Sequence, residues 1–168
     1  MRMQILAALV ALAPFGSVGA QAPFSDDERA VRSVVRQIAD TAHGQSASAR
    51  EALFADDAQI INAFGNRAQG RKEIDSFWES MFNTGMFRTA KNDEKSLSVR
   101  FLTPKLALVD RFYEFSGQRG PKSGRELPPR DIHMTLVLQK SAATWRIIYY
   151  SVADLRNLDR EKAAATSK

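Results

Sequence analysis

Cysteine is absent from this chain of 168 residues. Its absence excludes disulfide bonds, thiol catalysis and Cys-based zinc sites, so the fold depends on side-chain packing. Histidine occurs only twice, which is too little for a convincing metal site. The chain also has no Gly-rich phosphate loop, no dinucleotide fingerprint and no G-x-S-x-G motif, so nucleotide, nicotinamide and serine-hydrolase functions lack support. We therefore expect neither a metal nor a cofactor.

Charge of one sign does not dominate the sequence. The 24 Lys and Arg residues exceed the 19 Asp and Glu residues, which gives a formal net charge of +5. Both signs are scattered along most of the chain, which is typical of a mixed, solvated surface that attracts anions only weakly. No basic run is interleaved with aromatic residues, so nucleic acid is not an expected partner.

The N-terminal residues have the pattern of a secretory signal peptide. Arg2 is followed by an apolar stretch over residues 5–13 and by the small residues that precede a cleavage site after Ala20. The apolar stretch is shorter than the roughly 20 residues that a membrane span needs. We predict a periplasmic or secreted protein without membrane attachment, composed of a signal peptide (1–20), one domain (21–154) and a flexible charged tail (155–168).

Helical patterns precede strand patterns along the domain. Apolar spacing predicts helices over residues 26–43 and 47–54 and a third helix from Arg71 that ends at Gly85. Alternating patterns predict strands over residues 59–64, 96–102, 106–115, 131–140 and 145–153, with a turn or short return strand over 65–70. Gly and Pro residues indicate a loop over 117–129. This order predicts an α+β fold.

Tight turns allow the faces of the later strands to be predicted. A turn at Pro104 pairs Val99 with Asp110, which places this carboxylate alone on an apolar face. The opposite face of the same pair would carry Arg100, Arg111 and Tyr113.

A second turn near Ala142 places Tyr149 and Ser151 on the core face and His133 on the opposite face. A single bulge would reverse this assignment.

Three segments, residues 52–74, 99–109 and 135–148, resemble the SnoaL-like families of the nuclear transport factor 2-like superfamily, particularly the SgcJ/EcaC group. With the first helix, the resemblance covers almost the whole mature chain. It implies a cone-shaped, cystatin-like fold, in which a curved antiparallel sheet wraps around N-terminal helices and leaves a pocket open at one end. It also implies a homodimer formed through the outer sheet face. Members of the superfamily include isomerases, cyclases and dehydratases.

Several residues that are catalytic in such relatives are missing here. Asn62 occupies the position of the Asp that is the general base in ketosteroid isomerase relatives, and the first helix lacks their tyrosine. Ser151 replaces the His that ends the last strand in many SnoaL-like relatives. Asp56 and Asp57 are adjacent and point to opposite sides of an extended chain, so we interpret them as capping or turn-forming residues rather than a catalytic pair.

We expect the pocket to bind a small, largely apolar organic molecule. The candidate lining residues are Asn62, Phe64, Trp78, Phe82, Phe112, Tyr149 and Ser151.

Two alternatives remain open. The first is a cofactor-independent isomerase, cyclase or dehydratase in which Asp110 transfers a proton, with His133 or Tyr149 as its partner. The second is a scaffold that binds another protein through its outer sheet face, where Arg100, Arg111 and Tyr113 are expected.

Overall fold

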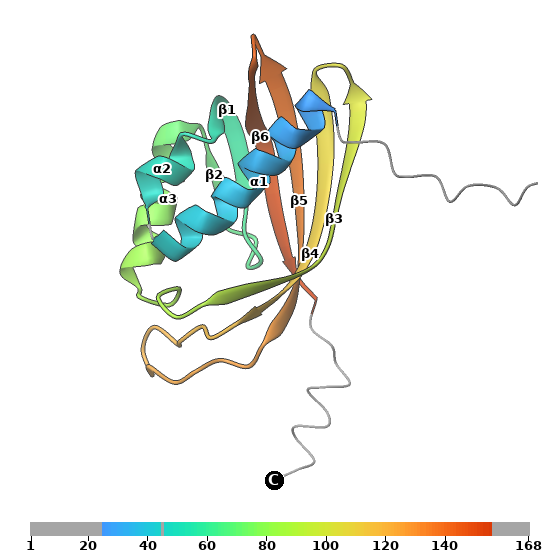
Figure 1. The fold of residues 1–168 in the computed structure, drawn as a ribbon. Coiled ribbons are helices and arrows are strands. Elements are labelled where there is room, and N and C mark those ends of the chain that lie inside the picture. The colour runs from blue at the N-terminus through green and yellow to red at the C-terminus, as the bar shows by residue number, and fades with distance from the viewer. Residues whose placement is uncertain (1–24, 45, 156–168) are drawn as a thin grey trace, which may run out of the picture.

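A curved, unclosed six-stranded sheet carries three helices against its concave face (Figure 1). This computed structural model describes residues 25–44 and 46–155. The helices are α1 (Asp26–Gly44), α2 (Ala47–Glu51) and α3 (Arg71–Asn83). The strands are β1 (Phe54–Ile61), β2 (Arg67–Gln69), β3 (Lys91–Thr103), β4 (Leu106–Ser116), β5 (Arg130–Ser141) and β6 (Thr144–Asp154). The predicted α+β class and cone architecture are therefore confirmed.

The strand order is β2-β1-β6-β5-β4-β3, and each pair of neighbours is antiparallel except β1 and β6, which are parallel. In Figure 1, α1 crosses the concave face of the long strands, whereas α2 and α3 lie beside β1 and β2. The lower parts of β3 and β4 curve beneath the helices (Figure 1).

The first helix starts where the sequence predicts it. The Ser25 hydroxyl accepts a hydrogen bond from the backbone N–H of Glu28 at 3.1 Å, as an N-cap residue does. Acidic residues follow in the first turn, where they interact favourably with the helix dipole. The face turned to the sheet is fully apolar and consists of Val31, Val34, Val35 and Ile38.

In the third helix, the side chains of Ile74, Trp78 and Phe82 recur at helical spacing and are buried. The boundary between the second helix and the first strand differs from the prediction. Helix α2 ends at Glu51, and β1 begins at Phe54 rather than at residue 59. The reason is tertiary, because the carbonyl of Leu53 already accepts a hydrogen bond from the N–H of Ile147 in β6 and Phe54 is fully buried.

A β-bulge reverses the predicted faces of β4. Thr103 pairs with Leu106 as expected, but the register then shifts, and Val99 lies opposite Val109 rather than Asp110. The side chains that β4 turns to the core are Ala107, Val109, Arg111 and Tyr113. The placement of Asp110 on the core face was therefore wrong. The predicted scaffold surface is also wrong for two of its three residues, because Arg111 and Tyr113 are buried.

A second bulge has the same effect on β6. The register between β5 and β6 shifts after the pair Leu138–Ile147, so Leu136 lies opposite Tyr150. Tyr150 is therefore the buried tyrosine, whereas Tyr149 and Ser151 turn to the outer face, contrary to the prediction.

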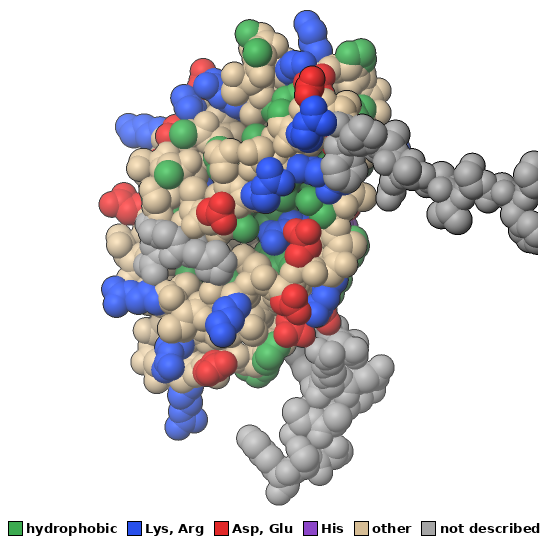
Figure 2. All heavy atoms as spheres, in the orientation of Figure 1, with side chains coloured by type: hydrophobic (Ala, Val, Ile, Leu, Met, Phe, Trp, Pro, Cys, Tyr) green, Lys and Arg blue, Asp and Glu red, His purple; other side chains and the backbone are tan. Residues whose placement is uncertain are grey.

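Charges of both signs are interspersed over the face that carries α1 (Figure 2). Within the described residues, no helix is long and apolar enough to cross a membrane. The signal peptide and the tail beyond residue 155 lie outside the described residues, so cleavage after Ala20 and export stay predictions.

Candidate functional site

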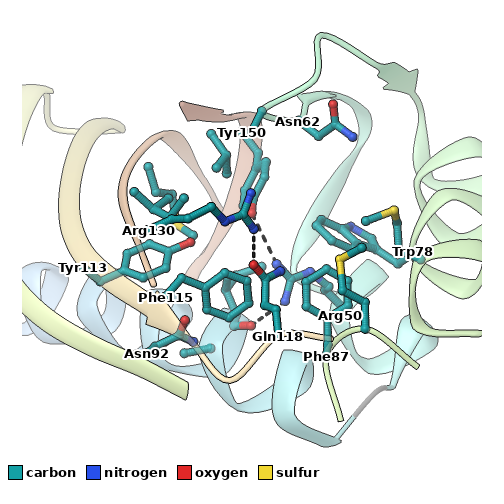
Figure 3. Close-up of a pocket in the computed structure, with 18 of the residues that line it drawn as sticks. Arg50, Asn62, Trp78, Phe87, Asn92, Tyr113, Phe115, Gln118, Arg130 and Tyr150 are labelled. Atoms are coloured by element: carbon teal, nitrogen blue, oxygen red, sulfur yellow. Dashed lines mark hydrogen bonds between the residues drawn. The ribbon is translucent and has the colours of Figure 1, made fainter. Parts of the chain in front are cut away.

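A cavity lies between α3, the concave face of the sheet and the loop that joins β4 to β5 (Figure 3). The volume of the cavity that the centre of a water molecule can occupy is about 100 Å³. A single water needs only roughly 10–15 Å³ on this measure. The curved sheet and the helices therefore enclose a hollow that side chains do not fill.

The walls of the cavity are mainly apolar, and aromatic rings form a continuous chain along them. Trp78 stacks on Phe82 at a centroid distance of 5.9 Å and meets Tyr150 edge to face at 5.8 Å. Phe87 continues the chain between Phe82, at 6.1 Å, and Phe115, at 5.8 Å. Such walls suit an apolar ligand.

The structure brings four of the seven predicted ligand-binding residues to this cavity: Asn62, Phe64, Trp78 and Phe82. Phe64 is 63% exposed, which places it at the mouth. The Asn62 Oδ1 accepts hydrogen bonds at 2.9 Å from the backbone N–H groups of Phe64 and Asn66, so this amide shapes the turn after β1. Its Nδ2 group is buried and has no hydrogen-bond partner.

Arg50 is the most unusual residue of the cavity, because it is a cation with only 3% of its surface exposed. Its guanidinium carbon lies 3.9 Å from the centroid of the Trp78 ring. Its Nη1 donates to the backbone carbonyl of Ile38 at 2.5 Å, and its Nη2 donates to the Tyr150 hydroxyl at 3.5 Å. Burial is the main cause that lowers the pKa of Arg50. Figure 3 shows this side chain between Trp78 and Gln118.

Two further arginines line the cavity, and each has a carboxylate partner. The Arg111 Nε lies 2.8 Å from Glu94, and the Arg130 Nη1 lies 2.9 Å from Asp154. Arg130 also donates a hydrogen bond to the side-chain oxygen of Gln118, which is 2% exposed. The hydrogen bond between Arg130 and Gln118 holds the β4–β5 loop against the start of β5 (Figure 3).

The lining side chains that the structure describes include no general base for neutral pH. None of the lining residues in the described part of the chain is Asp, Glu or His. Burial, as the main cause, raises the pKa of Tyr113 and of Tyr150, so both hydroxyls stay protonated. The described lining residues therefore include groups that can bind and orient a molecule, and no carboxylate or imidazole is among them.

The two predicted catalytic residues lie together on the outer face of the sheet, not in the cavity. The His133 Nε2 is 2.9 Å from the Asp110 carboxylate, which also accepts a hydrogen bond from Thr135 at 3.2 Å. Phe112 stacks on the His133 ring at 4.2 Å. Phe112, Tyr149 and Ser151 share this face and are absent from the cavity lining. This is the face through which a homodimer is expected, and the homodimer stays a prediction.

Asp56 and Asp57 are not turn residues, contrary to the interpretation of the sequence. Both are exposed and lie within β1, in the irregular stretch where its pairing with β6 is interrupted. Asp56 lies 3.2 Å from Arg71 at the start of α3. We interpret the ion pair between Asp56 and Arg71 as structural, since neither Asp56 nor Asp57 lines the cavity.

Sequence reasoning missed most of the polar residues of the cavity: Arg50, Arg111, Gln118, Arg130 and Tyr150. A signal for Arg50 was present, because Ala47, Arg50 and Leu53 recur at helical spacing and place the cation on the buried side of the short helix. Among the side chains that the structure describes, no three from His, Asp or Glu are grouped as a metal site requires.

Comparisons with known proteins agree with this architecture. The SnoaL-like domain family matches residues 31–153. No curated protein sequence matches the chain. The narrower SgcJ/EcaC grouping stays a prediction.

Solved structures share the fold at low sequence identity. An uncharacterised protein with a cystatin-like fold from Caulobacter vibrioides has a TM-score of 0.71 at 16% identity and covers 86% of this chain and 100% of its own. An NTF2-like protein with a cystatin-like fold from Novosphingobium aromaticivorans has a TM-score of 0.66 at 16% identity. The match covers 82% of this chain and 88% of that protein. A ketosteroid isomerase-like protein from Erwinia carotovora atroseptica has a TM-score of 0.65 at 17% identity. The match covers 80% of this chain and 100% of that protein. With its curved sheet, its cavity and the matched span from 31 to 153, the chain belongs to the SnoaL-like domain family.

Proposed function

We propose that this protein binds a small, largely apolar organic molecule in its cavity. The observation that carries the proposal is the unfilled hollow of about 100 Å³, which is walled by aromatic rings and contains polar groups at only a few places. Apolar walls supply affinity through burial, and a few polar groups orient the ligand.

The geometry favours binding over proton-transfer catalysis. Asp110, the proton-transfer group of the enzyme alternative, lies with His133 on the opposite face of the sheet from the cavity. A substrate in the cavity would therefore have no contact with either group. Isomerase chemistry of the kind named for one structural neighbour would need a base, and the described lining residues include no Asp, Glu or His.

A pair of matched substitutions tests the proposal. Val152 lines the cavity, whereas Val137 belongs to the outer face of the same sheet. We expect Val152→Phe to fill the cavity and to weaken binding of neutral alicyclic compounds, such as cyclohexanol and camphor, at least about tenfold, as a misfit group does in an apolar pocket. Val137→Phe is expected to leave the affinity unchanged.

The measurement is the fluorescence of Trp78 during titration with these compounds. The chain has two tryptophans, and Trp145 does not line the cavity, so a Trp145→Phe background isolates the signal of Trp78. Saturable binding with the same affinity in both valine variants would contradict the proposal, because the ligand would then sit outside the cavity. Absence of any saturable signal in the parent protein would contradict it as well.

A further inference from the structure

The charges around the cavity are unequal, and the excess charge is that of Arg50. Of the three arginines that line the cavity, Arg111 and Arg130 each have a carboxylate within 2.9 Å. Among the described residues, Arg50 has no carboxylate partner, and its acceptors are a backbone carbonyl and hydroxyl groups. A buried charge without a counter-charge is costly.

Unpaired hydrogen-bond donors accompany this unbalanced charge. The buried donors without a hydrogen-bond partner on lining residues are Arg50 Nε, Asn62 Nδ2, Trp78 Nε1 and Arg130 Nε. Buried donors are normally paired, so these four groups are exceptions that lack an acceptor. An anionic ligand supplies both the missing charge and strong acceptor oxygens.

The rest of the lining restricts the body of such a ligand. The guanidinium of Arg50 lies directly over the Trp78 ring, and the aromatic chain from Trp78 to Phe115 extends away from it. A molecule that reaches Arg50 with its charged end therefore places the remainder against aromatic walls. This geometry suits one charged group attached to a compact ring and does not suit a polyanion.

We propose that the ligand is an organic carboxylate with a compact aromatic or alicyclic body, and that its carboxylate pairs with Arg50. The inference rests on the proposed function, since it names the class of molecule that the same cavity takes. Arg50 is then a binding residue. When the ligand is present, its carboxylate supplies the counter-charge that offsets the free-energy cost of burying the guanidinium.

The test compares ligands that differ only in charge. Benzoate and benzamide form one pair, and cyclohexanecarboxylate and cyclohexanecarboxamide form another. At neutral pH, isothermal titration of the wild-type protein is expected to show each carboxylate binding at least about tenfold more tightly than its amide, the range for a hydrogen bond to a charged group. The carboxylates are also expected to raise the melting temperature more than the amides at equal concentration.

Arg50→Met removes the charge and is expected to abolish the preference for the carboxylate, so that both members of a pair bind equally. Arg100→Met makes the same change at an exposed position outside the cavity and is expected to keep the preference. If the Arg50 variant does not fold, the comparison within the wild-type protein still decides the question.

The outcomes separate this inference from the proposed function. Equal affinity of carboxylate and amide for the wild-type protein would overturn the anion inference and leave the apolar cavity intact as a binding site. Failure of both forms to bind, together with failure of neutral alicyclic compounds, would overturn the inference and the proposed function alike.

Discussion

Replacing Trp78 with alanine is expected to abolish ligand binding and to lower the free energy of unfolding by about 3–5 kcal/mol, the range for removal of a large buried aromatic side chain. Trp78 is 7% exposed, packs against Phe82 and Tyr150, and supports the guanidinium of Arg50 at 3.9 Å. The substitution therefore removes a wall of the cavity and the ring that covers the buried cation. Urea unfolding measures the loss of stability, and calorimetric titration with cyclohexanecarboxylate measures the loss of binding.

Trp145→Ala is the matched control, because Trp145 is also buried, with 3% exposure, but does not line the cavity. It is expected to lower stability by a similar amount, about 3–5 kcal/mol, and to retain binding under conditions in which it is folded. Loss of binding in both variants at equal folded fraction would show that the effect of Trp78 is general destabilisation. The assignment of Trp78 as a ligand-binding residue of the cavity would then be wrong.

Replacing Gly117 with alanine is the second substitution for which we expect a large effect. Gly117 has a φ of +68°, in the left-handed region, and a Cβ atom there would lie 2.3 Å from the carbonyl oxygen of Thr89. Backbone strain of this kind alone costs about 1–3 kcal/mol, and the collision with a backbone atom adds to it. Because the next residue, Gln118, holds Arg130 at the cavity, ligand affinity is expected to fall together with stability.

Comparison with Gly124→Ala separates the effect of backbone strain from the effect of the collision with Thr89. Gly124 has a similar φ of +63°, but a Cβ atom at this position would have no neighbouring atom within 4 Å. We expect the substitution to cost about 1–2 kcal/mol, the cost of a left-handed conformation for an L-residue, and to leave ligand affinity unchanged. Thermal unfolding of both variants measures the difference, and equal losses would mean that the β4–β5 loop moves freely away from Thr89.

The sequence was sufficient to predict the order of the elements and several of their boundaries, because local signals agree with the fold there. The N-cap and apolar spacing of α1 and the stripe Ile74, Trp78 and Phe82 of α3 each specify one buried face. The tight turns at Pro104 and Ala142 also fix the hairpins correctly, since Thr103 pairs with Leu106 and Ser141 with Thr144. These features depend on neighbours within a few residues.

The faces of the strands could not be predicted in the same way. One extra residue at each of two bulges moves Asp110 and Tyr149 to the outer face and brings Arg111 and Tyr150 to the cavity. A bulge has no sequence signature as clear as a turn, and a shift of one residue exchanges all subsequent faces. The polar part of the cavity was consequently missed, although its aromatic residues on α3 were found.

The central claim, that the cavity holds a small organic molecule, is tested most directly by native mass spectrometry of the protein purified from the organism that produces it. We predict a species heavier than the polypeptide by the mass of one small molecule per chain, which dissociates on denaturation and is missing from the Val152→Phe variant. Recovery of the ligand-free mass alone from both proteins, under conditions gentle enough to keep them folded, would contradict the account.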